Sequence, residues 1–340
     1  MVEMRVIVLI QILWICNTFG FVRYIINVPI KEGEVCQTEF LDGGKCMNVE
    51  LCDSAFIHSL SYEDHSSACQ QNAFYNVFCC QPFLDFCKHR KKPHIAHGTE
   101  AEPGTFPHLA RLGVKSDDGE IEWRCSANII SVKFLLTAAH CKAAAALAGV
   151  GCTGAAACEQ QITVKDFISH LNYNPTKKYH DIAVVKLHKN IEFNVRVLPI
   201  CPYANKNDIP DTEDMIIAGW GTTENLSNAK SLMYATVRTV PIKKCRDNYM
   251  EVAAILGKRL SDGVLAEQYC ARGSLVEPVN EYSDACQGDS GGPLQVKQGN
   301  DIYLVGVISV GIGCASALPG LYARVAAYFD WINATITGSP

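Results

Sequence analysis

The segment Asp284–Leu294 places a serine among glycines, in the order Asp-Ala-Cys-Gln-Gly-Asp-Ser-Gly-Gly-Pro-Leu. A serine hydroxyl is a weak nucleophile at neutral pH, so it needs a base within hydrogen-bond reach and donors for the oxyanion that forms on a substrate carbonyl. Gly288 and Gly291 lack a Cβ and permit unusual backbone angles, so we expect the N–H groups of Gly288 and Ser290 to point at one oxygen. The segment predicts a nucleophile, Ser290, beside an oxyanion hole.

A base and a carboxylate suited to this nucleophile occur upstream. The segment Phe134–Cys141 runs from apolar residues into His140, and Asp181 precedes the apolar run Ile182–Leu187. Serine hydrolases use an imidazole that a buried carboxylate holds in one tautomer. Each stretch alone is equally well explained as a surface turn, a core histidine or the start of a strand. The three together predict a catalytic triad of His140, Asp181 and Ser290.

The order His140, Asp181, Ser290 and the residues around each of them resemble the triad signatures of the chymotrypsin-type serine proteases, over residues 95–340. The resemblance implies an all-β fold of two six-stranded antiparallel β-barrels with a C-terminal helix. The first barrel would carry His140 and Asp181, and the second Ser290. A homologue that keeps the fold without the chemistry is the alternative, but all three catalytic positions are intact.

Strand-like runs that alternate with Gly-, Asn- and Pro-containing turns also favour a mostly β-stranded chain. Helical periodicity is convincing only at residues 325–336, and the alanine-rich residues 143–157 depart from the family, with a composition that favours helix. The predicted strands are Ile121–Ile130, Val195–Ile200, Met215–Ala218, Leu232–Val240 and Tyr303–Ser309.

The resemblance also predicts the substrate preference. It puts Asp284 at the floor of the primary specificity pocket, with Ser309, Gly311 and Gly320 in its walls. A carboxylate there would attract Arg or Lys by charge-assisted hydrogen bonds. The neighbouring Ala285 lacks a hydroxyl that would help to solvate a lysine ammonium, which favours Arg. The alternative is that Asp284 is an ordinary polar loop residue.

A second resemblance predicts how the protease is switched on. The segment Ile95–Gly98 is similar to the start of the mature catalytic chain in this family, where cleavage frees an apolar N-terminal residue. The new ammonium of Ile95 would then pair with Asp289, the residue before the serine. The bond to be cut is His94–Ile95, which a protease with Asp284 in its pocket should not cleave. We therefore expect a different upstream protease to activate this chain.

Composition and cysteine usage predict a secreted protein. An apolar run, Val6–Cys16, follows Arg5 and leads into small residues, so we expect residues 1–20 to be a signal peptide that is too short to span a bilayer. One of the 17 cysteines lies in this leader, and the even number that remains favours disulfides over zinc ligands. We expect no metal and no cofactor, and glycosylation at Asn225 and Asn333. The net charge of −5 gives no reason to expect nucleic acid.

Residues 36–80 crowd six cysteines into a segment poor in aliphatic residues, where cross-links must replace a core. Cysteine positions alone leave the pairing open, and another small knotted module is the alternative. Their spacing resembles the clip domain of arthropod serine proteases, with residues 81–94 as the linker that holds the activation bond. The resemblances imply the pairs Cys36–Cys79, Cys46–Cys69, Cys52–Cys80, Cys87–Cys201, Cys125–Cys141, Cys152–Cys158, Cys245–Cys270 and Cys286–Cys314.

Clip-domain proteases that are activated after a residue other than Arg or Lys resemble a class that acts midway in arthropod haemolymph cascades. The leading hypothesis is therefore a secreted haemolymph zymogen that cleaves after Arg in another clip protease zymogen, in melanisation or Toll-ligand processing. Its partners would be that protein substrate, an upstream activating protease and a serpin inhibitor, without nucleic acid or a membrane span. The alternatives are a non-catalytic clip-domain scaffold and a developmental cascade protease.

Overall fold

The computed structural model describes most of the chain from residue 100 onward, and only the backbone of four short strands before it. The described residues are 35–38, 41–48, 68–72, 75–80, 100–102, 104–152, 158–221, 231–252, 257–276, 281–282, 288–299, 301–310 and 318–338. The four early strands form one antiparallel sheet in the order β1-β2-β4-β3. They are β1 Val35–Thr38, β2 Leu41–Asn48, β3 Ala68–Asn72 and β4 Tyr75–Cys80.

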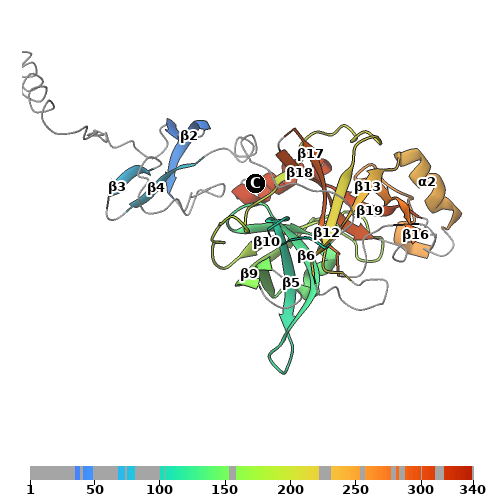
Figure 1. The fold of residues 1–340 in the computed structure, drawn as a ribbon, viewed down its shortest axis with the longest axis horizontal. Coiled ribbons are helices and arrows are strands. Elements are labelled where there is room, and N and C mark those ends of the chain that lie inside the picture. The colour runs from blue at the N-terminus through green and yellow to red at the C-terminus, as the bar shows by residue number, and fades with distance from the viewer. Residues whose placement is uncertain are drawn as a thin grey trace, which may run out of the picture.

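The first barrel closes six antiparallel strands in the order β10-β7-β6-β5-β8-β9 (Figure 1). Closure leaves no unpaired strand edge, and the inward-facing residues of all six strands fill the interior. In β7 all four residues are buried, because this strand lies between the barrel interior and the second barrel's elements. The strands are β5 Leu109–Lys115, β6 Ile121–Ile129, β7 Phe134–Thr137, β8 Leu147–Cys152, β9 Cys158–Ser169 and β10 Ala183–Leu187.

The second barrel closes through the pairing of β18 with β19, in the order β18-β17-β12-β13-β14-β19. A short strand, β11, adds to β18 in parallel. The described residues thus form two closed six-stranded antiparallel barrels, which confirms the predicted fold class. The elements are β11 Cys201–Pro202, β12 Met215–Gly219, β13 Met233–Thr239, β14 Gln268–Gly273, β17 Pro293–Gln298, β18 Asp301–Val310 and β19 Gly320–Arg324, with a separate hairpin of β15 Leu275–Val276 and β16 Glu281–Tyr282.

Two α-helices lie outside the barrels, and the sequence predicted only one of them. The C-terminal helix α4, Phe329–Thr337, follows the short 3-10 helix η5, Val325–Ala327, as expected. Helix α2, Ile242–Glu251, was missed. Its signals are weak but present: Pro241 stands at its start, and Cys245 and Tyr249, four residues apart, form its buried face. A further 3-10 helix, η4, spans Gly257–Leu260.

One predicted strand is wrong. Residues 195–200 form no strand, because Asn194 and Val197 close a tight turn through hydrogen bonds between their backbones, at 3.0 and 3.1 Å. The Asn194 side chain also accepts a hydrogen bond from the Arg196 N–H at 2.8 Å, and Val195 is 87% exposed. Side chains that bond to the local backbone compete with strand pairing. The next strand along the chain is the short β11.

The alanine-rich segment divides between two elements. Ala143 and Ala144 end the 3-10 helix η3, which spans Ala139–Ala144, and Leu147–Cys152 is strand β8. Pairing with β5 on one side and β9 on the other decides the conformation of β8 against the helical preference of its composition. Residues 153–157 lie outside the described part of the chain.

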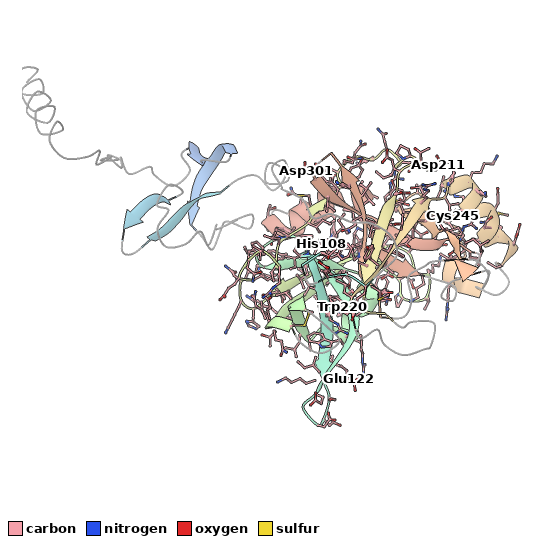
Figure 2. All side chains as sticks on the ribbon, viewed as in Figure 1. His108, Glu122, Asp211, Trp220, Cys245 and Asp301 are labelled. Carbon is pink, nitrogen blue, oxygen red and sulfur yellow. A yellow bond between two sulfur atoms is a disulfide. The ribbon has the colours of Figure 1, made fainter. Side chains whose placement is uncertain are left out.

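The largest hydrophobic cluster reaches from the first barrel into the second, which also has a cluster of its own. The largest buried cluster contains residues of the first barrel together with Leu304 and Val307 of β18 and Ile332 and Ile336 of α4. The C-terminal helix therefore packs on the first barrel, near β10, although the chain enters it from the second barrel (Figure 1). Trp220, which is 3% exposed, lies near the centre of the molecule (Figure 2). Residues where the two barrels meet therefore pack against both of them.

Candidate active site

His140 stands at the point where β7 leaves the first barrel. The chain turns from β7 into η3, and His140 is the second residue of this 3-10 helix. The next residue, Cys141, is disulfide-bonded to Cys125 on the neighbouring strand β6. This bond fastens the short helix to the barrel wall. The imidazole thus stands on a rigid support, and the His140 side chain is 22% exposed.

Asp181 fixes His140 by two hydrogen bonds. The backbone N–H of His140 donates to Asp181 Oδ1 at 2.9 Å, and the imidazole Nδ1 lies 2.7 Å from Asp181 Oδ2. With the proton on Nδ1, the other nitrogen, Nε2, is free to act as a base. The Asp181 side chain is only 1% exposed, so water does not compete for these bonds.

A third donor reaches this carboxylate from the second barrel. The hydroxyl of Ser309, on β18, donates to Asp181 Oδ2 at 2.6 Å. Ser309 was predicted to contact substrate. Its hydroxyl is instead committed to Asp181, so only the backbone of Ser309 is left for the substrate contact that the sequence predicts.

The surroundings of Asp181 keep it ionised. Burial would raise the pKa of the Asp181 carboxyl, but the hydrogen bond and charge of His140 lower it, with help from Ser309 and the His140 N–H. The net pKa lies below the ordinary value for an aspartate. A carboxylate that stays charged in a buried site stabilises a cation beside it. An imidazolium formed on His140 would receive that stabilisation.

Ser290 lies in a loop that both barrels hold in place. On the first-barrel side, the N–H of Ser126 donates to the Ser290 carbonyl at 2.8 Å, and the Asn128 amide donates to the Gly291 carbonyl at 2.9 Å. On the second-barrel side, the Gly291 N–H donates to the Ile308 carbonyl at 2.8 Å. Gly291 has φ +82°, and a Cβ there would collide with Thr137 and Ser126. Only glycine fits this position.

The sequence analysis missed Ser126, Asn128 and Thr137, three polar residues next to the serine loop. All three are buried, and Thr137 also donates to the Ser126 carbonyl at 2.8 Å. Their polarity inside the apolar strands β6 and β7 is the signal that was available. Buried polar side chains need partners, so their presence in a core strand indicates a fixed hydrogen-bonding task. Here the Asn128 amide and the Ser126 hydroxyl, which donates to the Gly288 carbonyl at 3.3 Å, hold the serine loop, and Thr137 supports Ser126.

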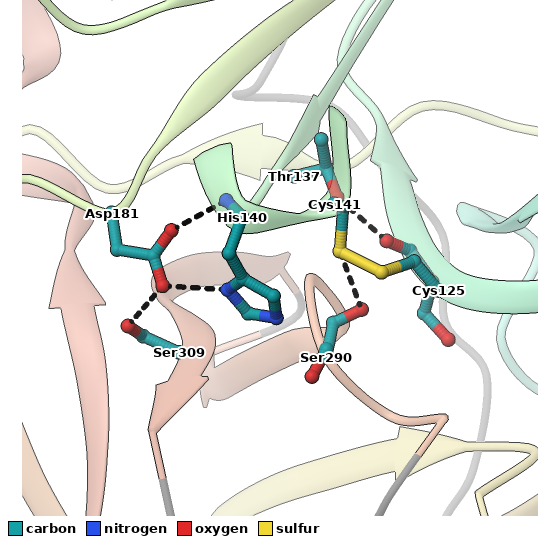
Figure 3. A network of polar contacts seen from close by, with 8 residues as sticks. Cys125, Thr137, His140, Cys141, Asp181, Ser290 and Ser309 are labelled. Carbon is teal, nitrogen blue, oxygen red and sulfur yellow. Dashed lines mark hydrogen bonds and ion pairs between the residues drawn. A yellow bond between two sulfur atoms is a disulfide. The ribbon is translucent and has the colours of Figure 1, made fainter. Parts of the chain in front are cut away.

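The imidazole of His140 lies between the carboxylate of Asp181 and the side chain of Ser290 (Figure 3). Within the described part of the chain, Ser290 Oγ has no hydrogen bond to His140, and the N–H groups of Gly288 and Ser290 donate none. Gly288 adopts φ +97°, a left-handed conformation that suits glycine. Contacts between base and nucleophile often tighten only when substrate binds. The arrangement has the parts needed for acyl transfer: nucleophile, base, orienting carboxylate and two uncommitted donors.

The carboxylate of Asp289 lies against Gly219 and Gly221, whose missing side chains leave a space that we call the seat of Asp289. The N–H of Gly221 donates to Asp289 Oδ1 at 2.7 Å. A Cβ on Gly219 would overlap Oδ1 and lie 2.8 Å from the carboxyl carbon, and a Cβ on Gly221 would lie 2.6 Å from that carbon. The carboxylate therefore rests against the backbone on either side of the buried Trp220. Its predicted partner, Ile95, lies outside the described residues.

Comparison with known proteins agrees with this geometry. Residues 95–332 match the family model described as Trypsin. A CLIP domain-containing serine protease, C9 of Anopheles gambiae, is 56% identical over 340 residues, covering 100% of this chain and 95% of that protein. This chain belongs to the clip-domain serine proteases of the trypsin family. The resemblance found in the sequence is thereby confirmed.

Two other relatives of this clip-domain protease are matched over a smaller part of their length. The serine protease Hayan of Drosophila melanogaster is 34% identical over 72% of this chain, which spans 39% of Hayan. Phenoloxidase-activating enzyme 1 of Spodoptera litura is 32% identical over 71% of this chain and 67% of its own length.

The disulfides of the clip-domain protease are visible in part. Besides Cys125–Cys141, the structure joins Cys152 to Cys158 and Cys245 to Cys270. Cys201 is also disulfide-bonded, and its predicted partner, Cys87, lies outside the described residues. The pairs Cys36–Cys79, Cys46–Cys69, Cys52–Cys80 and Cys286–Cys314 involve side chains that are not described, and stay predictions.

Several predicted site residues also stay predictions. His94, Ile95, Asp284, Gly311 and Asn225 lie outside the described part of the chain. Gly320 begins β19 and is buried, and the glycosylation candidate Asn333 is exposed on α4. Across the residues that are described, no helix combines the length and apolar character needed to cross a membrane.

Proposed function

We propose that this clip-domain protease is a secreted zymogen of a serine endopeptidase whose catalytic triad is His140, Asp181 and Ser290. The observation that carries the proposal is the imidazole of His140, whose Nδ1 lies 2.7 Å from Asp181 Oδ2 on the side facing away from Ser290, while the His140 backbone N–H donates to Asp181 Oδ1 at 2.9 Å. An imidazole oriented in this way has one task in acyl transfer, which is to move the proton of the nucleophile.

The steps follow from the positions of the groups. Ser290 Oγ attacks the substrate carbonyl carbon while Nε2 of His140 takes the hydroxyl proton. The charged Asp181 stabilises the resulting imidazolium, and the N–H groups of Gly288 and Ser290 bind the oxyanion. His140 then gives the proton to the leaving amine, which departs as the acyl-enzyme forms. Water, activated by the same imidazole, releases the acid and restores Ser290.

We infer a preference for Arg, and less strongly Lys, before the scissile bond. The support is the identity of Asp284 at the position that forms the pocket floor in the family, together with glycines at Gly311 and Gly320 that leave the walls open. A guanidinium can form two parallel hydrogen bonds with one carboxylate, which an ammonium cannot. Ala285 offers no hydroxyl to compensate, so we expect Arg to be the better substrate.

Activation, in this proposal, depends on cleavage of His94–Ile95. The freed ammonium of Ile95 would pair with Asp289, whose carboxylate rests on Gly219 and Gly221 beside the serine loop. A buried charge that lacks its partner is costly, by about 3–5 kcal/mol. The active arrangement of Asp289 therefore becomes stable only after cleavage supplies the Ile95 ammonium. His94 does not fit a pocket with a carboxylate floor, so the activating protease differs from this one.

The natural substrate that we propose is the zymogen of another clip-domain protease in an extracellular cascade. Relatives of this chain include proteins named phenoloxidase-activating enzyme 1 and phenoloxidase-activating factor 3. Melanisation is therefore the favoured setting, with Toll-ligand processing and a developmental cascade as alternatives. The proposal includes secretion into the haemolymph after removal of residues 1–20, a clip domain over 36–80, a linker over 81–94 and a serpin as inhibitor.

The test uses the full chain with His94→Arg, which immobilised trypsin can cut and which filtration then separates from the trypsin. We expect the cut protein to begin at Ile95 by N-terminal sequencing and to hydrolyse an Arg-ending chromogenic peptide faster than its Lys counterpart. The matched Ser290→Ala protein should lose the rate by several powers of ten, on the order of 10⁴-fold or more. Asp284→Ser should remove the Arg preference while Ser290 still reacts with a phosphonylating reagent.

Two results would contradict the proposal. Equal hydrolysis by the Ser290→Ala protein would mean that another group performs the reaction. A cut chain that begins at Ile95 and turns over no peptide would favour the alternative in which the protease domain is a scaffold.

A further inference from the structure

Four aromatic side chains form a ring cluster at the turn that carries Asp181. They are His170, His180, Tyr328 and Trp331. The two imidazoles stack, with centroids 5.3 Å apart and planes at 23°. The edge of His170 also meets Tyr328 at 5.1 Å and Trp331 at 5.0 Å. None of these residues takes part in the mechanism described above, yet the cluster includes the residue directly before Asp181.

The backbone at His180 is in a conformation that needs support. Its φ is +52°, in the left-handed region that residues with a Cβ rarely adopt. The Ile182 N–H donates to the His180 carbonyl at 2.8 Å, so the chain turns tightly about Asp181. The His170 N–H donates to the Ile182 carbonyl at 3.0 Å and fixes the far side of the turn. Unfavourable backbone angles persist only where the surroundings hold them.

The side chain of His180 supplies such a hold. Its Nδ1 lies 3.1 Å from the hydroxyl of Tyr328, which is only 4% exposed. Tyr328 in turn stands at the start of α4, where the Ile332 N–H donates to its carbonyl at 2.8 Å. The C-terminal helix is thereby connected through two side chains to the turn that presents Asp181.

The turn and the carboxylate are held by different partners. Ser309 and His140 bond the Asp181 oxygens, while His180 is anchored away from them on Tyr328. A shift of the turn would move the carboxylate relative to Nδ1 of His140, whose 2.7 Å contact leaves little room. Misplacement by about 1 Å is enough to cost about 100-fold in rate.

We propose that His180 is a positioning residue for Asp181, and that its stacked pair with His170 makes this positioning sensitive to acid. The inference rests on the proposed catalytic function. His180 touches neither substrate nor the reacting atoms, and acts by holding the turn on Tyr328. Two stacked imidazoles repel each other when both are charged, so a second proton on this pair loosens the hold.

Among the described residues, the carboxylates whose charge acts on this cluster are Asp181 and Glu267. Burial and the charge of His180 lower the pKa of His170. Burial and the charge of Asp181 raise the pKa of Tyr173 to about 12, so this tyrosine stays neutral. Burial, with Glu267 and Asp181, raises the pKa of Tyr328 as well. Of these two carboxylates, Asp181 is already bonded to His140.

The test compares three variants of the full chain after cleavage. His180→Leu removes the ring nitrogen and disfavours the left-handed angle, and Tyr328→Phe removes only the anchoring hydroxyl. We expect each to lower kcat by about 10- to 100-fold with KM unchanged within about twofold. His180→Asn is the conservative control, because Asn tolerates this backbone angle and keeps a polar atom near Tyr328. It should restore kcat.

The pH profile separates positioning from a general effect on folding. In wild type we expect the acid limb of kcat to be steeper than in His180→Asn, because a proton on His170 disturbs the hold only where a second imidazole is stacked on it. Superimposable profiles for the two proteins, or full kcat in both His180→Leu and Tyr328→Phe, would overturn the proposal.

A second readout does not depend on turnover. The proton between His140 Nδ1 and Asp181 should give a far-downfield NMR resonance in the uncut chain, sharp in wild type and His180→Asn and broadened in His180→Leu. If the cut wild type proves inactive, the proposed function fails while this resonance still tests the positioning. An unchanged resonance in His180→Leu would contradict it.

Discussion

A methyl group on Gly219 should inactivate this protease without touching its triad. In Gly219→Ala the new Cβ would overlap Oδ1 of Asp289 and lie 2.8 Å from the carboxyl carbon. The carboxyl would have to withdraw by about 0.6 Å or more to reach ordinary contact. That withdrawal breaks the 2.7 Å hydrogen bond from the Gly221 N–H. Because Asp289 adjoins Ser290, the displacement reaches the donors of the oxyanion hole.

Two contributions set the size of the effect. Overpacking a close-packed site costs about 1–3 kcal/mol, and losing a hydrogen bond to a charged group about 1.5–3 kcal/mol. Together they disfavour the seated carboxylate by about 3–5 kcal/mol, which corresponds to a loss of about 100- to 4,000-fold in kcat/KM. The proposed ammonium of Ile95 would meet a carboxylate that is out of place.

The assay measures kcat/KM on an Arg-ending chromogenic peptide, with the His94→Arg chain cut by immobilised trypsin as parent. Gly263→Ala is a matched control, because a Cβ there has nothing within 4 Å, although φ is +72°. The control should lose about 1–2 kcal/mol of stability and keep its activity. A Gly219→Ala protein within about threefold of the parent would show that the seat of Asp289 does not govern catalysis.

Two further predictions concern the surroundings of Asp181. Ser309→Ala removes one hydrogen bond from Asp181, raises the pKa of that carboxyl and should lower kcat/KM by about 10-fold or more; a change below twofold on the same peptide would be inconsistent with this role. The second concerns stability in acid. Burial and the charge of His180 lower the pKa of His170 in the folded chain. The unfolded chain binds this proton near pH 6.5 and the folded chain only at lower pH, so stability falls as pH drops through that window. In urea unfolding at about pH 7.5 and about pH 5, wild type should lose more stability than His170→Gln, and equal losses would count against it.

Local sequence patterns were sufficient for the fold class and for the order of the predicted triad. The residues around His140, Asp181 and Ser290 form short contiguous motifs, so they can be recognised without any tertiary information. Strands such as β6 and β18 also follow from strand-like runs between turn residues. The pattern failed where a local side-chain bond decided the conformation, at residues 195–200, and where a helix had only a few apolar positions, at α2.

Tertiary structure alone decided which distant side chains serve the site. Ser309 and Asp181 are 128 residues apart, and Asn128 and Gly291 are 163 apart, yet hydrogen bonds join each pair. The same holds for His180 and Tyr328, at 148. Periodicity reports which face of an element is buried, but not what that face meets. Closure of two barrels against a shared core determines those meetings, because it sets the distances between segments that the chain itself leaves far apart.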